Sequence, residues 1–111
     1  MTLPFPTGPM RGNAAAYTAF FTESFIDELA GIAQRDPLLY RLSLLGQDAR
    51  AAVVLRAAAR LGEWDGGVEG TAQGIAMIRM DLGQGDRVAR GFIACVAQAR
   101  LGEGGVRVDR L

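Results

Sequence analysis

Lysine and histidine are both missing from this chain of 111 residues, so all twelve of its basic residues are arginine. Without histidine, the chain has neither the commonest general base nor the commonest protein metal ligand. Without lysine, it cannot form a Schiff base with a carbonyl substrate. The composition alone therefore excludes catalysis by histidine, metal binding through histidine and Schiff-base formation by lysine.

Only one cysteine is present, Cys95, which excludes an internal disulfide and any zinc or iron–sulfur site built from several cysteines. Cys95 lies in the apolar run from Gly91 to Ala97. Because its neighbours are apolar and no histidine can activate it, we expect a small thiol buried in the core.

The chain also has a formal net charge of zero, because twelve acidic residues balance the twelve arginines. Nucleic-acid-binding domains usually carry a basic face, so we expect no nucleic-acid partner. No apolar run is long enough to span a bilayer, and the N-terminal residues lack the charged and apolar regions of a secretion signal. Half of the residues are hydrophobic, which is typical of a packed globular domain.

The first half of the chain has the pattern of helices. Three of the four prolines fall within residues 1–12, which predicts an extended or turned start. Asn13, Asp36 and Asp48 can cap helix N-termini, and Asp36 is followed by a proline suited to the first helical position. Gly46 is expected to end the second helix as a C′ glycine, and Gly62 is expected to stop the third. The predicted helices cover about 13–34, 36–45 and 48–61.

The first predicted helix carries an aromatic stripe and an acidic cluster. The stripe of Phe20, Phe21 and Phe25 has helical spacing, and we expect it to face the core. The acidic cluster has the three members Glu23, Asp27 and Glu28. Paired carboxylates can perform acid–base chemistry, but no partner base lies nearby, which favours a solvated helix face.

The second half of the chain has the pattern of strands, predicted over about 74–80, 88–100 and 106–111, with a glycine-rich hairpin before the last. Helices followed by strands indicate an α+β fold. The predicted organisation is a helical segment over 1–63 that carries an arginine loop, a linker over 64–73 and a β-hairpin segment over 74–111. Together they form one domain or part of a larger subunit.

Trp64 is expected to fill the junction between the helical and strand segments.

The second half also carries two weak candidates for a ligand site. Gly83 and Gly85 form a Gly-x-Gly pattern, but no third glycine opens a helix after them, so a loop between strands is favoured over a dinucleotide site. Asp81 and Asp86 could bind a cation, although they lack the ligand series of a calcium loop.

A loop with one arginine, Arg11, precedes the first predicted helix. A helix N-terminus presents free N–H groups and partial positive charge, so such a loop can hold an anion or a polar cofactor. Physics alone favours an ordinary exposed arginine at this position.

The order of the motifs resembles the molybdopterin-binding subunit of the xanthine dehydrogenase and aldehyde oxidase family, nearest to its isoquinoline 1-oxidoreductase beta-subunit branch. The motifs that carry this resemblance are Met10-Arg11-Gly12, the helix Glu23-Ser24-Phe25-Ile26-Asp27-Glu28-Leu29-Ala30, Asp36-Pro37-Leu38 with Arg41-Leu42 and Leu44-Leu45, Gly74-Ile75-Ala76-Met77, Phe92 to Ala99, and Gly105 to Arg110.

The resemblance implies a molybdenum hydroxylase, an oxidoreductase that hydroxylates N-heterocycles or aldehydes and passes electrons to an iron–sulfur partner subunit. It places Met10, Arg11, Gly12 and Asn13 beside the molybdopterin cofactor. Position 10 departs from the family, which prefers an aromatic residue there. Members of the family occupy the cytoplasm and the periplasm.

The family's catalytic glutamate lies in a Gly-Glu-Pro segment, which this sequence lacks, and the glycine-rich cofactor loops that precede the matched region are lacking too. We therefore expect a fragment of the large subunit, with no catalytic residue and no metal ligand of its own, that is inactive without the remainder of that subunit.

A different interpretation needs no enzyme. The predicted sheet has open edges, and such edges pair readily with another chain. The chain would then be a non-catalytic interaction module that pairs through its sheet edge with a partner or with a second copy. A degenerate gene remnant is a third interpretation.

Overall fold

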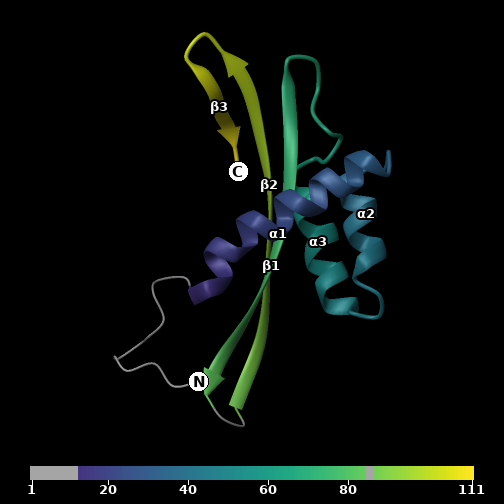
Figure 1. Ribbon diagram of the computed structural model, residues 1–111, viewed down its shortest axis with the longest axis vertical. Helices are drawn as coiled ribbons and strands as arrows, with labels where there is room; N and C mark the ends of the chain where they lie inside the picture. Colours follow the sequence, from purple (N-terminus) through teal and green to yellow (C-terminus); the bar gives the residue numbers. More distant parts are fainter. Residues whose placement is uncertain (1–12, 85–86) are drawn as a thin grey trace.

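The computed structural model describes residues 13–84 and 87–111, in which three helices precede a three-stranded antiparallel sheet (Figure 1). This arrangement confirms the predicted α+β class. The elements are α1 (Asn13–Ile32), α2 (Pro37–Leu44), α3 (Ala49–Leu61), β1 (Thr71–Gln84), β2 (Arg87–Gly102) and β3 (Gly105–Arg110).

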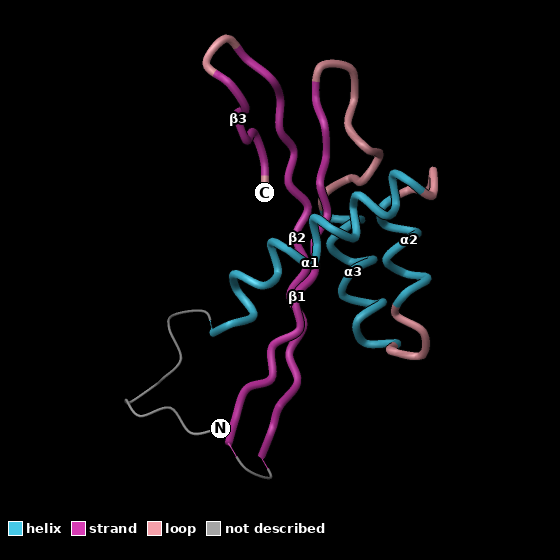
Figure 2. The backbone as a smooth tube through the Cα atoms, in the orientation of Figure 1, coloured by secondary structure: helices cyan, strands magenta, loops and turns pink. Residues whose placement is uncertain are grey.

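The sheet has the order β1-β2-β3 and is dominated by the long β1–β2 hairpin. Thr71 lies opposite Arg100 at one end of this hairpin, and Ile75 lies opposite Val96 four pairs further along. β3 pairs only with the C-terminal part of β2, so the other end of the hairpin is a two-stranded ribbon, whose tip extends beyond the helices (Figure 2).

The helix starts follow from local chemistry, as the sequence predicted. The Asp36 side chain accepts a hydrogen bond from the backbone N–H of Leu39 at 2.8 Å. The Asp48 side chain accepts one from Ala51 at 3.1 Å. Each bond satisfies an N–H that has no partner within its own helix. Gly46 has φ +56° after α2, which confirms its predicted left-handed role.

Gly62 ends α3, as predicted. Its φ is −81°, and the residue that adopts the left-handed conformation after α3 is Glu63, with φ +50°. A Cβ added at Gly62 would lie 2.5 Å from the Cβ of Val96. Glycine is therefore needed here because α3 ends directly against β2.

The first two strands are longer than predicted, and the linker is shorter. β1 begins at Thr71 within the expected linker 64–73 and continues to Gln84, while β2 extends to Gly102. The expected hairpin joins β2 and β3, with Gly102 opposite Gly105. α1 ends at Ile32, two residues before the predicted end, and Gln34 follows with φ +50°.

The core lies between α3 and one face of the sheet. Leu55 and Ala59 of α3 pack with Ile75 of β1 and Val96 of β2, and all four are buried. Trp64 packs against this cluster, and its Nε1–H donates a hydrogen bond to Oδ2 of Asp36 at 2.9 Å. The tryptophan therefore joins the helical and strand segments, as predicted.

α1 has the opposite orientation to the predicted one. Phe20, Phe21 and Phe25 are 70%, 69% and 59% exposed, so the aromatic stripe does not face the core. The buried side of the helix instead carries Ala30 and the acidic Glu23. The reason is a buried arginine that requires the carboxylates of α1, which is described below.

Cys95 is exposed, so the prediction of a buried core thiol was wrong. Side chains alternate between the two faces of a strand. Val96 next to it points into the core, and Cys95 therefore lies on the other face of the sheet, which α3 does not cover.

The close contact of Gly62 with Val96 generates a matched pair of variants. Gly62→Ala should destabilise the fold by about 1–3 kcal/mol, because the added methyl group would overpack the core. Gly31→Ala in α1 meets no atom within 4 Å and should stabilise the fold by roughly 0.5–1 kcal/mol through helix propensity. Urea denaturation followed by circular dichroism measures both changes, and equal effects of the two variants would contradict the packing role of Gly62.

Candidate functional site

The predicted cofactor loop lies almost wholly outside the described residues. Met10, Arg11 and Gly12 are not among them, and Asn13 is the first residue of α1. Their assignment to a molybdopterin site remains a prediction. The functional analysis of the described residues therefore starts from their most extensively bonded polar side chain, Arg41.

Arg41 of α2 is 3% exposed and lies between α1 and α2. Its Nε–H donates to Oε2 of Glu23 at 2.9 Å, and Nη1 donates to Oδ1 of Asp27 at 2.6 Å. Nη1 also donates to the carbonyl oxygen of Pro37 at 3.2 Å, and Nη2 donates to that of Glu23 at 3.0 Å. These bonds engage the whole planar fork of the guanidinium, as charge-assisted pairs of high strength do.

The same glutamate also holds the edge of the sheet. Oε2 of Glu23 accepts a hydrogen bond from the backbone N–H of Met77 in β1 at 3.0 Å. Within the described part of the chain, β1 has no strand on that side, so this N–H points away from the β1–β2 ladder. One carboxylate oxygen therefore joins α1, α2 and β1. We call Arg41, Glu23, Asp27 and the Met77 N–H the Arg41 cluster.

The acidic cluster was predicted to lie on a solvated helix face, and this prediction was wrong for Glu23. The Glu23 side chain is only 15% exposed, whereas Asp27 is 44% exposed, and both are bound to Arg41. Glu28 is exposed, as expected. The sequence of the helix alone could not reveal this partner of the carboxylates, because Arg41 lies on another helix.

Electrostatics keep Arg41 charged. Burial by itself would lower the pKa of the guanidinium, but the hydrogen bonds to Asp27 and Glu23 outweigh that effect and raise its pKa above the ordinary value. A raised pKa contributes stability at every pH below the pKa of the unfolded chain, and this contribution is lost only as pH rises through the folded-state pKa. The guanidinium of Arg41 therefore stays charged throughout the physiological range.

The Arg41 cluster is suited to holding elements together. A guanidinium has five N–H donors, and the four bonds leave at most one of them free. Among the described residues, no buried side-chain nitrogen or oxygen lacks a partner. A sequence signal for this cluster did exist, since Arg41 is the one charged residue in the leucine-rich stretch from 37 to 45.

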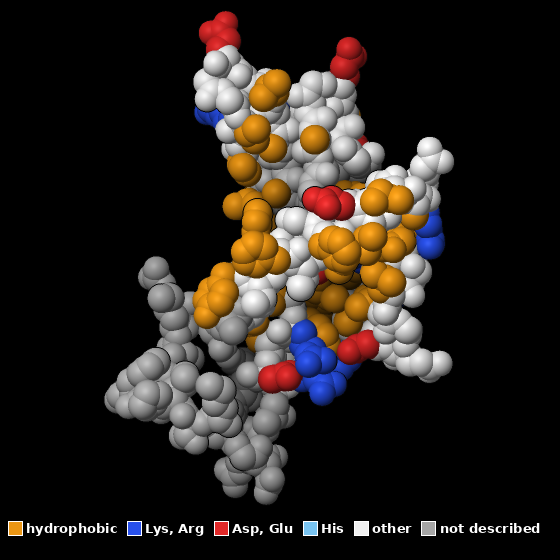
Figure 3. Space-filling view, in the orientation of Figure 1, with side chains coloured by type: hydrophobic (Ala, Val, Ile, Leu, Met, Phe, Trp, Pro, Cys, Tyr) orange, Lys and Arg blue, Asp and Glu red, His pale blue; other side chains and the backbone are white. Residues whose placement is uncertain are grey.

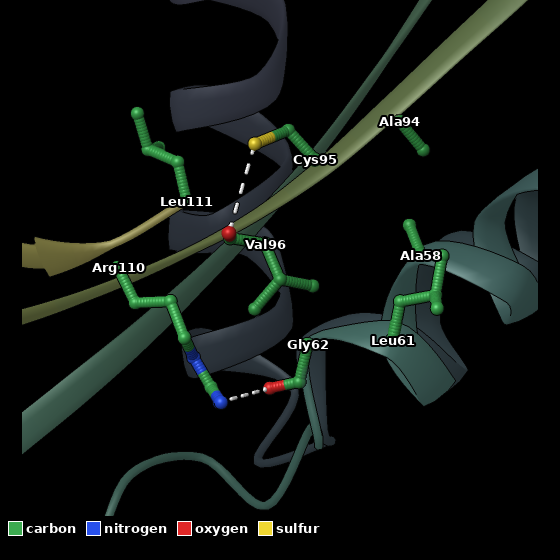
Figure 4. A pocket seen from close by; sticks show the side chains of 8 residues that line it. All are labelled: Ala58, Leu61, Gly62, Ala94, Cys95, Val96, Arg110 and Leu111. Atoms are coloured by element: carbon green, nitrogen blue, oxygen red, sulfur yellow. Dashed lines mark hydrogen bonds between the residues drawn. The ribbon is translucent and has the colours of Figure 1, made fainter.

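A small hollow lies where the end of α3 meets the sheet (Figure 4). Its volume is about 220 Å³, and most of its lining is apolar, with Leu61, Val96 and Leu111 among the contributors. The one charged side chain, Arg110, is already bound, because Nη2 donates to the carbonyl oxygen of Gly62 at 2.8 Å and Nη1 to Oε2 of Glu63 at 3.0 Å. The hollow therefore presents no free polar group to orient a substrate.

The cation candidates are not supported by a ligand group. Asp81 forms ion pairs with Arg79 at 3.5 Å and with Arg90 at 3.6 Å, and Asp86 lies outside the described residues. In the part of the chain that the structure describes, no group of three or more acidic or cysteine side chains could hold a metal ion. No described helix has the length and apolar character that crossing a membrane requires.

Comparisons with known proteins add no relative: the sequence matches no protein-family model and no curated protein. The resemblance to the molybdopterin-binding subunit therefore depends on the motifs themselves.

Removing Arg41 should be costly, because two carboxylates would lose their partner inside the fold. We expect Arg41→Met to destabilise the protein by about 3–5 kcal/mol. Arg56→Met, at an exposed position of α3, should change stability by less than about 0.5 kcal/mol. Thermal and urea unfolding measure both variants.

The Arg41 cluster also predicts which of its variants loses more stability. Asp27→Asn should cost less than Arg41→Met, because the Asp27 side chain is 44% exposed and remains solvated. A loss at Arg41 no larger than the loss at Arg56 would show that the Arg41 cluster does not hold the elements together.

Proposed function

We propose that this chain is part of the large subunit of a molybdenum hydroxylase, in which its helices and long hairpin form scaffold that carries the loop Met10–Asn13 to the molybdopterin cofactor. The parent protein would be an oxidoreductase of the xanthine dehydrogenase and aldehyde oxidase family, with an iron–sulfur subunit as its partner. This chain would supply no catalytic residue of its own.

One observation carries the proposal. Three separate motifs of the resemblance meet in the Arg41 cluster: the helix motif supplies Glu23 and Asp27, the Asp-Pro-leucine motif supplies Arg41, and the Gly-Ile-Ala-Met strand supplies the Met77 N–H. Motifs that are distant in the sequence and share one interaction are expected to occur together. This shared contact is a physical reason for these motifs to form one unit of the scaffold.

In this proposal the described residues have a structural role and no chemical one. They bring together no ligand set for a metal, so no chemical step is assigned to them. Their part is to fix where α1 begins, because the cofactor loop runs directly into its N-terminus. A helix N-terminus offers N–H groups and partial positive charge to an anionic group of a cofactor.

The non-catalytic interaction module is the second candidate, and a specific observation favours it. All six residues of β3 are exposed, and within the described residues no strand lies on its outer side. Such an edge can accept a further strand from a partner. In this function the motifs of the Arg41 cluster serve stability alone.

The polypeptide isolated from its source cells separates the two candidates. An antibody against the β1–β2 hairpin would capture it for intact-mass measurement, metal analysis and fluorescence of the oxidised pterin. The enzyme proposal expects a polypeptide well above 11.8 kDa, with a Gly-Glu-Pro peptide and stoichiometric molybdenum. A polypeptide of 11.8 kDa without molybdenum or pterin would overturn the proposal and favour the interaction module.

Variants of that same polypeptide test the loop. Arg11→Ala should lower the pterin content severalfold while leaving the melting temperature unchanged, because the proposal assigns Arg11 to cofactor contact and not to the core. Arg56→Ala, at an exposed position of α3, is the matched control and should leave both quantities unchanged. Equal pterin content in the two variants would remove Arg11 from the cofactor site.

A further inference from the structure

α1 presents an aromatic ridge away from the core, formed by Tyr17, Phe20, Phe21 and Phe25. These side chains are 53%, 70%, 69% and 59% exposed, and the rings of Phe20 and Phe21 meet edge to face with centroids 5.5 Å apart. A surface helix normally buries such a stripe and exposes its acidic residues. Because α1 does the reverse, its largest apolar surface is left uncovered within the described part of the chain.

A groove runs beside this ridge, between α1 and the sheet face opposite α3. Its floor is made of the small residues Gly74, Ala76, Cys95 and Ala97, and Phe20 lines its side. Its volume is about 540 Å³. Glu23 and Asp27 also border the groove, but both carboxylates are bound to Arg41, so the groove offers mainly apolar surface.

The apolar surface continues along the same sheet face toward the β2–β3 hairpin. Strand alternation and the register place Ala99, Leu101, Val106 and Val108 on this face, and the last three are 81%, 76% and 56% exposed. Figure 3 shows hydrophobic side chains gathered along α1 and over this hairpin on one side of the molecule. The sheet face carries no charged side chain at these positions.

We propose that this face binds a second copy of the chain, with the aromatic ridge of each copy seated in the groove of the other. The ridge and the groove lie side by side on one face. A two-fold axis between them, in the plane of the interface, therefore brings each ridge over the opposite groove, as a self-complementary dimer requires. The absence of charge on the sheet face and ridge removes the like-charge repulsion that two identical surfaces would otherwise suffer.

The available area approaches that of a standard dimer interface. Aromatic side chains bury about 150–250 Å² each, so four that are more than half exposed supply roughly 400–600 Å² per copy. The exposed aliphatic side chains of the sheet face raise this toward the ~800 Å² per partner of a standard interface. The small residues of the groove floor allow the partner's rings to approach the backbone closely.

The natural cysteine reports on this interface directly. Cys95 is the only cysteine in the chain, is exposed in the single copy and lies on the groove floor. Sedimentation velocity over a dilution series should give a species of twice 11.8 kDa that dissociates on dilution. The rate at which iodoacetamide alkylates Cys95 should fall severalfold in the dimer and recover as the dimer dissociates.

Two variants locate the contact. Phe21→Glu places a charge on the ridge and should raise the dimer Kd by about 30-fold or more, as loss of a buried aromatic anchor does. Val53→Glu is the control, because Val53 is similarly exposed at 64% but lies on α3, which packs on the other face of the sheet. It should leave the dimer Kd unchanged, and circular dichroism should show both variants folded.

Three results would overturn the inference. The first is a monomer at all concentrations. The second is a dimer in which Cys95 reacts as fast as in the monomer, which would indicate pairing through the β3 edge. The third is an equal response of Phe21→Glu and Val53→Glu. The inference concerns the 111-residue chain itself and does not depend on the proposed enzyme function.

Discussion

The bonds between Arg41 and Glu23 are the constraint on which the arrangement of the elements depends. A guanidinium that is 3% exposed must have its charge balanced, and the two carboxylates that bind it both come from α1. α1 is therefore turned so that its acidic side faces inward. Once Glu23 is fixed in this way, its second bond reaches the Met77 N–H and sets the position of the helix along β1. Ion pairs of this kind contribute little net stability over apolar packing, but they exclude arrangements that leave a buried charge unpaired.

This orientation separates two kinds of surface. On one face of the sheet, α3 buries Leu55 against Ile75 and forms a conventional apolar core. On the other face, small residues and the aromatic ridge remain open to solvent. The chain thus uses polar contacts to attach α1 and leaves the aromatic side chains of that helix outside. The described residues therefore leave a large apolar surface open on this side of the molecule.

Local signals predicted most of the fold. The caps Asp36 and Asp48 and the left-handed Gly46 were correct, because each depends only on neighbouring backbone groups. The strands were correct in order, but the first two were predicted too short, since pairing extends a strand beyond its apolar run. The predictions that failed depend on contacts between residues distant in the sequence. The orientation of α1 depends on Arg41 of another helix, and the close approach of Gly62 to Val96 depends on β2. The candidate site shows the same pattern. The sequence predicted a site in the loop Met10–Asn13, whereas the Arg41 cluster, which joins three elements, was not predicted.

Glu23 and Met77 are 54 positions apart, and this separation has a consequence for how the chain acquires its structure. α1 is the first described element to be synthesised, yet its inward carboxylate finds its last partner only when β1 exists. A ribosome adds roughly 5–20 residues per second, so the helix waits about 3–11 s for that strand. During this interval the inward carboxylate of α1 lacks its partner on the sheet. The first element to be made is thus among the last to be fixed.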